Sequence, residues 1–228
     1  MKDVHNLNVI AVVVAYVLSS ISFPYWIARR AGVDLRTTGS RKLGGSNLFR
    51  TVGPIAGVTS GVLDGAKGFV AVLAVSAAGL GTDTALACGV AAAAGQLWPV
   101  FHRFDGGRAN ATGWGFALAA DPPAAVAMAI PVLAAAALRL LTKPRSSRIM
   151  PLAALASFAV WPAVIWEQQG TTPKVIAGLA VFALVLIRRL TADLYLDLAT
   201  GAPAARVLWN RAMFDRSELQ ERGLVAIS

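Results

Sequence analysis

Apolar stretches separated by short polar segments run along most of the chain. A helix needs about 20 predominantly apolar residues to cross a bilayer. The main stretches lie at residues 9–27, 54–80, 84–100, 124–141, 149–166 and 175–187. A shorter one, 111–120, is stopped by Asp121-Pro122-Pro123 and can cross only where its neighbours shelter it. The pattern predicts an all-α integral membrane protein with about seven transmembrane helices, of which one is a short broken span.

The distribution of cations predicts which side of the membrane each polar segment faces. Cytoplasmic loops are enriched in Lys and Arg. If the N-terminus is outside and residues 111–120 count as a crossing, every basic segment falls on the cytoplasmic side. These segments are 29–50, 103–108, 143–148 and the tail from Arg188. We therefore expect a multi-pass membrane protein with an external N-terminus and a cytoplasmic C-terminus, and with its basic segments at the cytoplasmic face.

The composition is that of a membrane protein and not of an ordinary soluble domain. Of the 228 residues, 56% are hydrophobic and 14% are charged, against about 25% charged in soluble domains. Residues 1–190 are expected to form one seven-span domain, and residues 191–228 a cytoplasmic amphipathic tail. The single Cys88 rules out a disulfide within one chain. The first apolar stretch lacks a basic flank and an A-x-A cleavage site, so it is expected to be retained.

The polar segment 34–53 is the first candidate binding site. It combines a glycine pair, short hydroxyl side chains and an asparagine with four cations and one acid, Asp34. The cations are Arg36, Arg41, Lys42 and Arg50. A loop of this kind has backbone N–H groups that can point at an anion, with fixed positive charge around them. The segment therefore predicts an anion site at a membrane surface.

Two further features extend this prediction. Asp64 and Lys67 are three residues apart, so on a helix they share a face and can pair. Each would cost about 2.5–3.5 kcal/mol if unpaired at mid-bilayer. The pair is interpreted either as a structural ion pair or as a lysine directed into the anion site. Gly106-Gly107-Arg108 opens a second helix, where free N–H groups favour anions. No His or Cys pairing predicts a metal site.

Three segments resemble, in order and spacing, the motifs of the bacterial acyl-phosphate:glycerol-3-phosphate acyltransferases (PlsY-like). Residues 19–53 resemble the first motif through Val33-Asp-Leu-Arg36, Gly39-Ser40, Gly44, Asn47, Arg50 and Gly53. The second motif is matched by Leu63-Asp64 with Lys67-Gly68. The third is matched by Gly95, Pro99, Phe104, Gly106-Gly107 and Ala111-Thr112. The resemblance covers about residues 15–120 and identifies the chain as a divergent member of the family.

The resemblance implies a membrane enzyme that moves a fatty acyl group from acyl phosphate to glycerol 3-phosphate, or to a related polyol phosphate, giving lysophosphatidic acid. It implies no cofactor, and its partners are these substrates and membrane lipids; nucleic acid is not expected. It also implies a location in the bacterial plasma membrane, with the active site at the cytoplasmic face. Carried over, catalytic roles fall on Ser40, Asn47 and Arg50. Substrate or phosphate binding falls on Gly39, Gly44, Gly45, Ser46, Lys67, Gly106, Gly107 and Arg108.

Several positions depart from the family's motifs. Arg41-Lys42 stands where the family has Gly-Asn, Gln96 where it has His, and Asp105 and Arg108 where it has Lys. Asp105 is expected to weaken the positive field at the site, while Arg41-Lys42 strengthens it nearby. Beyond residue 120 the resemblance is weak.

Two other functions stay open at this stage. A non-catalytic relative that binds anionic lipid or phosphate, or that partners a lipid-synthesis enzyme, would fit the altered Gln96 and Arg41-Lys42. A small transporter would use Asp64 and Lys67 as a relay, although the sequence shows no inverted repeat of the kind found in many transporters.

Overall fold

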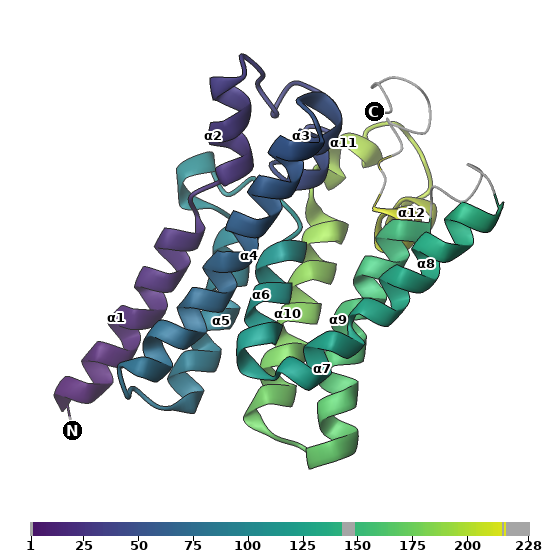
Figure 1. Cartoon of the computed structure of the whole chain (residues 1–228). Helices are drawn as coiled ribbons and strands as arrows, with labels where there is room; N and C mark the ends of the chain where they lie inside the picture. Colours follow the sequence, from purple (N-terminus) through teal and green to yellow (C-terminus); the bar gives the residue numbers. More distant parts are fainter. Residues whose placement is uncertain (1, 143–148, 216, 218–228) are drawn as a thin grey trace.

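The structure, a computed structural model, describes residues 2–142, 149–215 and 217 (Figure 1). Within these residues every regular element is a helix, which confirms the all-α class. The longer helices are α1 (Lys2–Ser19), α4 (Pro54–Ala77), α5 (Thr82–Leu97), α8 (Ala129–Thr142), α9 (Ile149–Gln169) and α10 (Pro173–Thr191). The shorter elements are α2 (Phe23–Arg30), α3 (Gly45–Thr51), the 3-10 helix η1 (Val100–His102), α6 (Asn110–Ala120), α7 (Pro122–Ala127), α11 (Leu194–Leu198) and α12 (Ala204–Phe214).

The first apolar stretch is broken near its end. A single helix was expected over residues 9–27, but α1 ends at Ser19 and α2 begins at Phe23. Pro24 lies in the first turn of α2, where its missing N–H is tolerated, while the same residue could not continue α1. The hydroxyl of Ser22 caps α2 by accepting a backbone N–H at 3.3 Å. The break presents backbone carbonyls that a side chain from another helix can bind.

The number of membrane crossings stays a prediction. Within the described residues, five segments are long and apolar enough to cross. They are His5–Arg30, Pro54–Ala77, Thr82–His102, Pro122–Leu141 and Ile149–Gln169. Seven crossings would add α6, which has 11 residues, and α10, which has 19 and carries three cations. The first residues of α1 and the helices α11 and α12 lie at opposite ends of the molecule in Figure 1. The basic turn expected at 143–148 lies outside the described residues.

The fifth expected span is divided near a proline. The apolar stretch 124–141 is divided into α7 and α8, with the break at Met128. Pro131, in the first turn of α8, has no N–H to bond the carbonyl one turn earlier, which weakens the helix at this break. Asp121 caps α7 by accepting the Ala124 N–H at 3.2 Å.

Helices α4 and α6 lie in close contact because small residues face each other. A Cβ atom added to Gly115 would lie 1.9 Å from the Gly65 carbonyl oxygen. One added to Gly68 would lie 2.0 Å from the Thr112 carbonyl oxygen. Small residues allow membrane helices to approach this closely. The contact holds the short α6 against the full-length α4, which gives it the shelter that its length requires.

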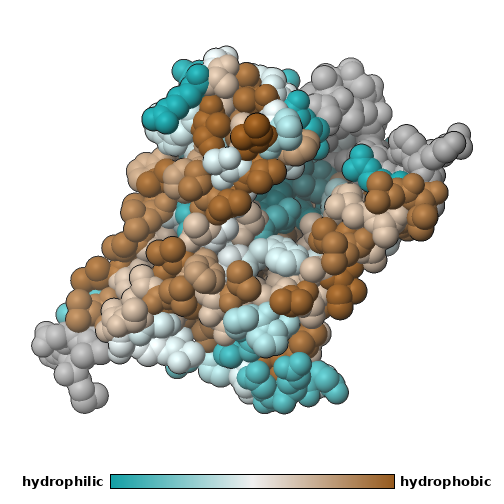
Figure 2. All heavy atoms as spheres, in the orientation of Figure 1, coloured by the Kyte–Doolittle hydropathy of each residue, from teal (hydrophilic) through white to brown (hydrophobic). Residues whose placement is uncertain are grey.

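The flanks of the molecule are apolar. Leu140 is 86% exposed and Ile55 is 83% exposed, and large aliphatic side chains on many helices share this exposure. A contiguous apolar surface of this extent is unusual for a soluble monomer. Figure 2 shows hydrophobic side chains along the flanks, hydrophilic ones at both ends, and a hydrophilic hollow in the upper half. The surface is that of an integral membrane protein.

The α4–α6 contact predicts a stability effect at Gly115. The G115A variant is expected to lose about 1–3 kcal/mol of unfolding free energy. Its methyl group would overlap the backbone of α4 at Gly65, so the two helices would have to move apart. The matched control is G61A on α4, where a Cβ has open space. Thermal unfolding in detergent can be followed by thiol labelling of Cys88, which is buried. Equal midpoints for G115A and G61A would contradict the prediction.

Candidate functional site

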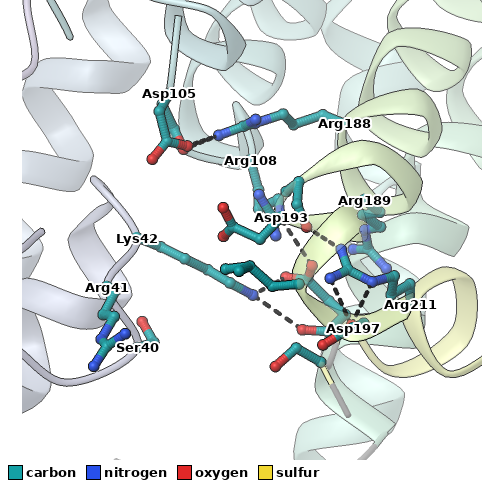
Figure 3. A pocket seen from close by; sticks show the side chains of 15 residues that line it. Ser40, Arg41, Lys42, Asp105, Arg108, Arg188, Arg189, Asp193, Asp197 and Arg211 are labelled. Atoms are coloured by element: carbon teal, nitrogen blue, oxygen red, sulfur yellow. Dashed lines mark hydrogen bonds and ion pairs between the residues drawn. The ribbon is translucent and has the colours of Figure 1, made fainter. Parts of the chain in front are cut away.

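A cavity of about 90 Å³ (Figure 3) lies at the end of the molecule that carries α3, α11 and α12 in Figure 1. Four segments far apart in sequence form its wall: the loop before α3, the loop before α6, the α10–α11 junction and the end of α12. The lining residues are Ser40, Arg41, Lys42, Asp105, Gly106, Arg108, Arg188, Arg189, Ala192, Asp193, Leu196, Asp197, Arg211, Asp215 and Ser217. In Figure 3 the Lys42 side chain extends from its loop across the cavity towards Asp197 and Arg211.

The wall of this cavity carries surplus positive charge. Six Arg and Lys side chains and four Asp side chains line it. Among the described residues, the Ser40 hydroxyl and the Nε and Nη1 groups of Arg189 are buried there without a hydrogen-bond partner. Buried donors are rarely left unpaired in folded proteins. The surplus charge and the unpaired donors together favour an anionic, hydrogen-bonding ligand.

Asn47 holds the loop that carries Ser40. Its buried side-chain oxygen accepts the Ser40 N–H at 3.0 Å. Its amide group donates to the carbonyls of Thr38 at 3.0 Å and Lys42 at 3.2 Å. These contacts fold the loop back on α3, so that Ser40 and Lys42 both reach the cavity. The geometry gives Asn47 a positioning role, and its catalytic role stays a prediction.

Gly106 and Gly107 are packed against the end of α5. A Cβ added to Gly106 would lie 2.4 Å from the Gln96 carbonyl oxygen, and one added to Gly107 would lie 2.8 Å from the Leu43 carbonyl oxygen. The Gly107 N–H donates to the Gln96 carbonyl at 3.0 Å. The glycine pair therefore lets the chain pass close to α5, and the next residue, Arg108, enters the cavity wall.

The reversed charge at Asp105 is compensated by a later part of the chain. Arg188 donates from Nη2 to the Asp105 carboxylate and, at 3.1 Å, to the Gly106 carbonyl. The Asp105 side chain is 65% exposed, whereas that of Arg188 is 7% exposed. The ion pair ties the loop before α6 to the end of α10 at the edge of the cavity.

Asp215 bridges two cations in the cavity. Its Oδ2 accepts from Lys42 Nζ at 2.7 Å, and its Oδ1 accepts from Arg108 Nε at 2.8 Å. Burial, together with repulsion from Arg108, lowers the pKa of Lys42 to about 8. Burial acts to raise the pKa of Asp215, but Arg108, Lys42 and Arg189 hold it well below its usual range. Lys42 and Asp215 are therefore mainly charged at neutral pH.

Asp64 and Lys67 form the expected ion pair, with Nζ 2.9 Å from Oδ1. The ammonium also donates to the carbonyls of Ser19 at 3.1 Å and Ile21 at 2.9 Å, and to the side-chain oxygen of Gln96. Gln96 donates in turn to Asp64 at 3.1 Å. This arrangement fits the structural interpretation of the pair. Lys67 does not line the cavity, and its substrate role stays a prediction.

The cavity collects part of the predicted site. Ser40, Gly106 and Arg108 line it, and so do the departures from the family motif at Arg41-Lys42 and Asp105. The other predicted residues lie outside its wall, and their roles stay predictions. They are Gly39, Gly44, Gly45, Ser46, Asn47, Arg50, Lys67 and Gly107. Ser46 and Arg50 among them are exposed.

Sequence reasoning missed the contribution of the last part of the chain to the cavity. The wall includes Arg188, Arg189, Asp193, Asp197, Arg211 and Asp215. The sequence analysis uses the adjacent cations at 188–189 to orient the chain in the membrane and assigns them no role in the site. No local pattern marked the tail as part of a site. No group of three or more His, Cys, Asp or Glu side chains within the described residues could hold a metal ion.

Comparisons with known proteins agree on one family. The sequence profile described as "Glycerol-3-phosphate acyltransferase" matches residues 9–194. A glycerol-3-phosphate acyltransferase of Thiobacillus denitrificans is 35% identical over 208 residues, which cover 87% of this chain and 96% of that protein.

Two solved structures share the fold. The crystal structure of PlsY (YgiH), an integral membrane glycerol 3-phosphate acyltransferase, in its glycerol 3-phosphate form has a TM-score of 0.69 and 28% identity. The match covers 89% of this chain and 98% of that one. The lysophosphatidic acid form has a TM-score of 0.68 and 27% identity, and the match covers 85% and 92% of the two chains.

The Lys67 contacts predict a stability defect that a second substitution relieves. The K67M variant leaves the Asp64 carboxylate buried without its cation, which typically costs about 3–5 kcal/mol. The double variant D64N/K67M removes the stranded charge and is expected to regain part of that loss. Thermal unfolding followed by Cys88 labelling compares the two. A K67M protein with the wild-type midpoint and a raised KM would instead support the substrate role.

Proposed function

The chain belongs to the glycerol-3-phosphate acyltransferase family, and we propose that it transfers a fatty acyl group from acyl phosphate to the 1-hydroxyl of glycerol 3-phosphate. The hydroxyl oxygen forms a bond to the acyl carbon, and the bond between that carbon and the phosphate oxygen breaks. The products are lysophosphatidic acid and inorganic phosphate, which carries away the hydroxyl proton. A related polyol phosphate is the alternative acceptor.

The observation that carries this proposal is the cationic cavity at one end of an apolar helix bundle. Both substrates carry phosphate, and phosphate is bound well by Arg forks and by a Lys point charge. Arg108, Arg189 and Lys42 supply these groups within one wall. A fatty acyl chain can stay in the lipid beside the apolar flanks while its phosphate end reaches the cavity.

Ser40 is assigned the most direct role among the predicted catalytic residues. Its hydroxyl is buried at the cavity and unpaired within the described part of the chain, so it can donate to a phosphate or acyl oxygen of the substrate. Asn47 fixes its position through the Ser40 N–H. Preorganised donors aimed at developing negative charge can lower a reaction barrier by several kcal/mol.

The location of the site follows from the charge distribution. The loops that line the cavity are the basic ones, and basic loops favour the cytoplasmic side. We therefore place the cavity at the cytoplasmic face of the plasma membrane, with the N-terminus outside. The comparisons give no support to the non-catalytic alternative, because the relatives reported above are named as acyltransferases.

The decisive experiment measures phosphate release by the purified protein in lipid, given palmitoyl phosphate with and without glycerol 3-phosphate. Release that requires the acceptor and yields an acylated product is expected. A parallel reaction with palmitoyl-CoA tests the donor, and equal transfer from the thioester would contradict the proposed use of acyl phosphate. Release that does not require the acceptor would indicate hydrolysis instead of transfer.

Removal of the Ser40 hydroxyl is expected to reduce activity. Loss of one hydrogen bond to a charged group costs about 1.5–3 kcal/mol, so kcat/KM of S40A should fall about 10- to 100-fold. The matched control is T37A in the same loop, whose hydroxyl donates to the Asp34 carbonyl at 3.2 Å and does not line the cavity. The idea fails if S40A keeps the kcat/KM of T37A.

A further inference from the structure

The C-terminal part of this chain adds a wall to the cavity beyond the family match. That match ends at residue 194, whereas α12 and Asp215 follow it. Helix α12 packs against α9 and α10. The side chain of Val207 is 1% exposed within this packing. The extension is therefore docked on α9 and on α10, whose last residues line the cavity.

A buried ion pair between Arg211 and Asp197 holds α12 against α11. Arg211 is 3% exposed and Asp197 is fully buried. Arg211 Nε donates to Asp197 Oδ2 at 2.7 Å, and Nη1 donates to the Ala192 carbonyl. Asp215 follows at the end of α12 in the left-handed region, with φ +50°, and its N–H donates to the Arg211 carbonyl at 3.1 Å. The Arg211–Asp197 pair and this backbone hydrogen bond together fix the position of the Asp215 carboxylate.

Asp215 makes the contacts expected of a bound phosphate. Its two carboxylate oxygens each accept from a different cation, Lys42 and Arg108. Lys42 Nζ also donates to its backbone carbonyl at 3.0 Å. The Asp215 side chain is 13% exposed and that of Arg108 is 12% exposed, so the anion is held in a largely enclosed place.

The contacts of Asp215 indicate that this arrangement blocks a phosphate site. Lys42 and Arg108 already donate to its two carboxylate oxygens. A phosphate can therefore bind the same two cations only when the Asp215 carboxylate leaves them.

We propose that Lys42 and Arg108 form a phosphate subsite and that Asp215 of the C-terminal extension occupies it as an internal competitor. The inference rests on the proposed function for the identity of the phosphate, which belongs to glycerol 3-phosphate or to acyl phosphate. An incoming phosphate displaces Asp215, and the end of α12 moves away from the cavity. Lys42 thereby becomes a specificity residue of this chain, at a position where the family has Asn.

The charges around the subsite support this exchange. Arg189 faces it from α10 with unpaired donors in the described structure, and Arg41 lines it from the loop. When Asp215 is displaced, three carboxylates instead of four offset the positive charge of the six cations in the wall. A phosphate dianion then meets a stronger positive field than the one that holds the carboxylate. Substrate therefore competes well against a tethered acid.

The test is the kinetics of D215N, which keeps the shape of the side chain and removes its charge. If the competitor occupies nine sites in ten, the apparent affinity of the substrate is reduced about tenfold, and D215N restores it. KM for one of the two substrates is expected to fall about tenfold, with kcat not reduced. Varying glycerol 3-phosphate and palmitoyl phosphate separately shows which phosphate uses the subsite. Unchanged or raised KM values for both would overturn the proposal.

The matched control is D193N. Asp193 lines the same cavity, whereas the ion pairs of Lys42 and Arg108 are with Asp215. D193N removes the same charge without freeing Lys42 or Arg108, so it is expected to lower either KM much less than D215N does. A fall in KM as large as that of D215N would show a general field effect and would overturn the assignment to Asp215.

A second measurement does not depend on acyl transfer. In a C88A/V207C background, thiol labelling at position 207 reports whether α12 is docked. Inorganic phosphate is expected to speed this labelling, and D215N to speed it without phosphate. One outcome is that the protein transfers no acyl group, with or without D215N, while the labelling still responds as expected. In that case the proposed function is wrong, and the proposal that Asp215 competes with phosphate is supported. Labelling that responds to neither change would overturn the competitor, whatever the activity.

Discussion

The Asp64–Lys67 ion pair is the interaction on which the arrangement of the first half depends. A charge pair inside a membrane helix is stable only when its remaining hydrogen-bonding capacity is used. Here the broken end of α1 supplies two carbonyls to Lys67, and Gln96 of α5 bonds both members of the pair. Thr112 of α6 donates to the Asp64 carbonyl at 2.9 Å. One pair thus fixes four helices relative to one another.

This fixed arrangement brings the two glycine-containing loops to the same place. After the break at the end of α1, the chain continues through α2 into the loop that Asn47 holds through the Ser40 N–H. Gly106 and Gly107 pack against the end of α5. The loops themselves bond few groups with one another. Their positions follow from the helices that precede them, and the cavity forms where both meet the end of α10.

The cavity depends on balance between cations and carboxylates. Six cations in one wall would repel one another strongly in a partly enclosed space. Three Asp side chains of the wall relieve part of that repulsion: Asp105 pairs with Arg188, Asp197 with Arg211, and Asp215 with Lys42 and Arg108. The surplus that remains suits phosphate. In the proposed exchange, Asp215 holds two of these cations until a phosphate replaces it.

The sequence by itself determined the helical class, the apolar stretches, the pairing of Asp64 with Lys67 and the family motifs, because these features depend on residues near one another in the chain. It also predicted that Ser40 and Arg108 belong to one site, and both line the cavity. The tertiary structure decided the break at Ser19, the positioning role of Asn47 and the contribution of the tail. Lys42 and Asp215 are 173 residues apart, and a carboxylate near the end of a chain carries no local sign of the cation it will meet. Such contacts arise only when packing brings distant segments together.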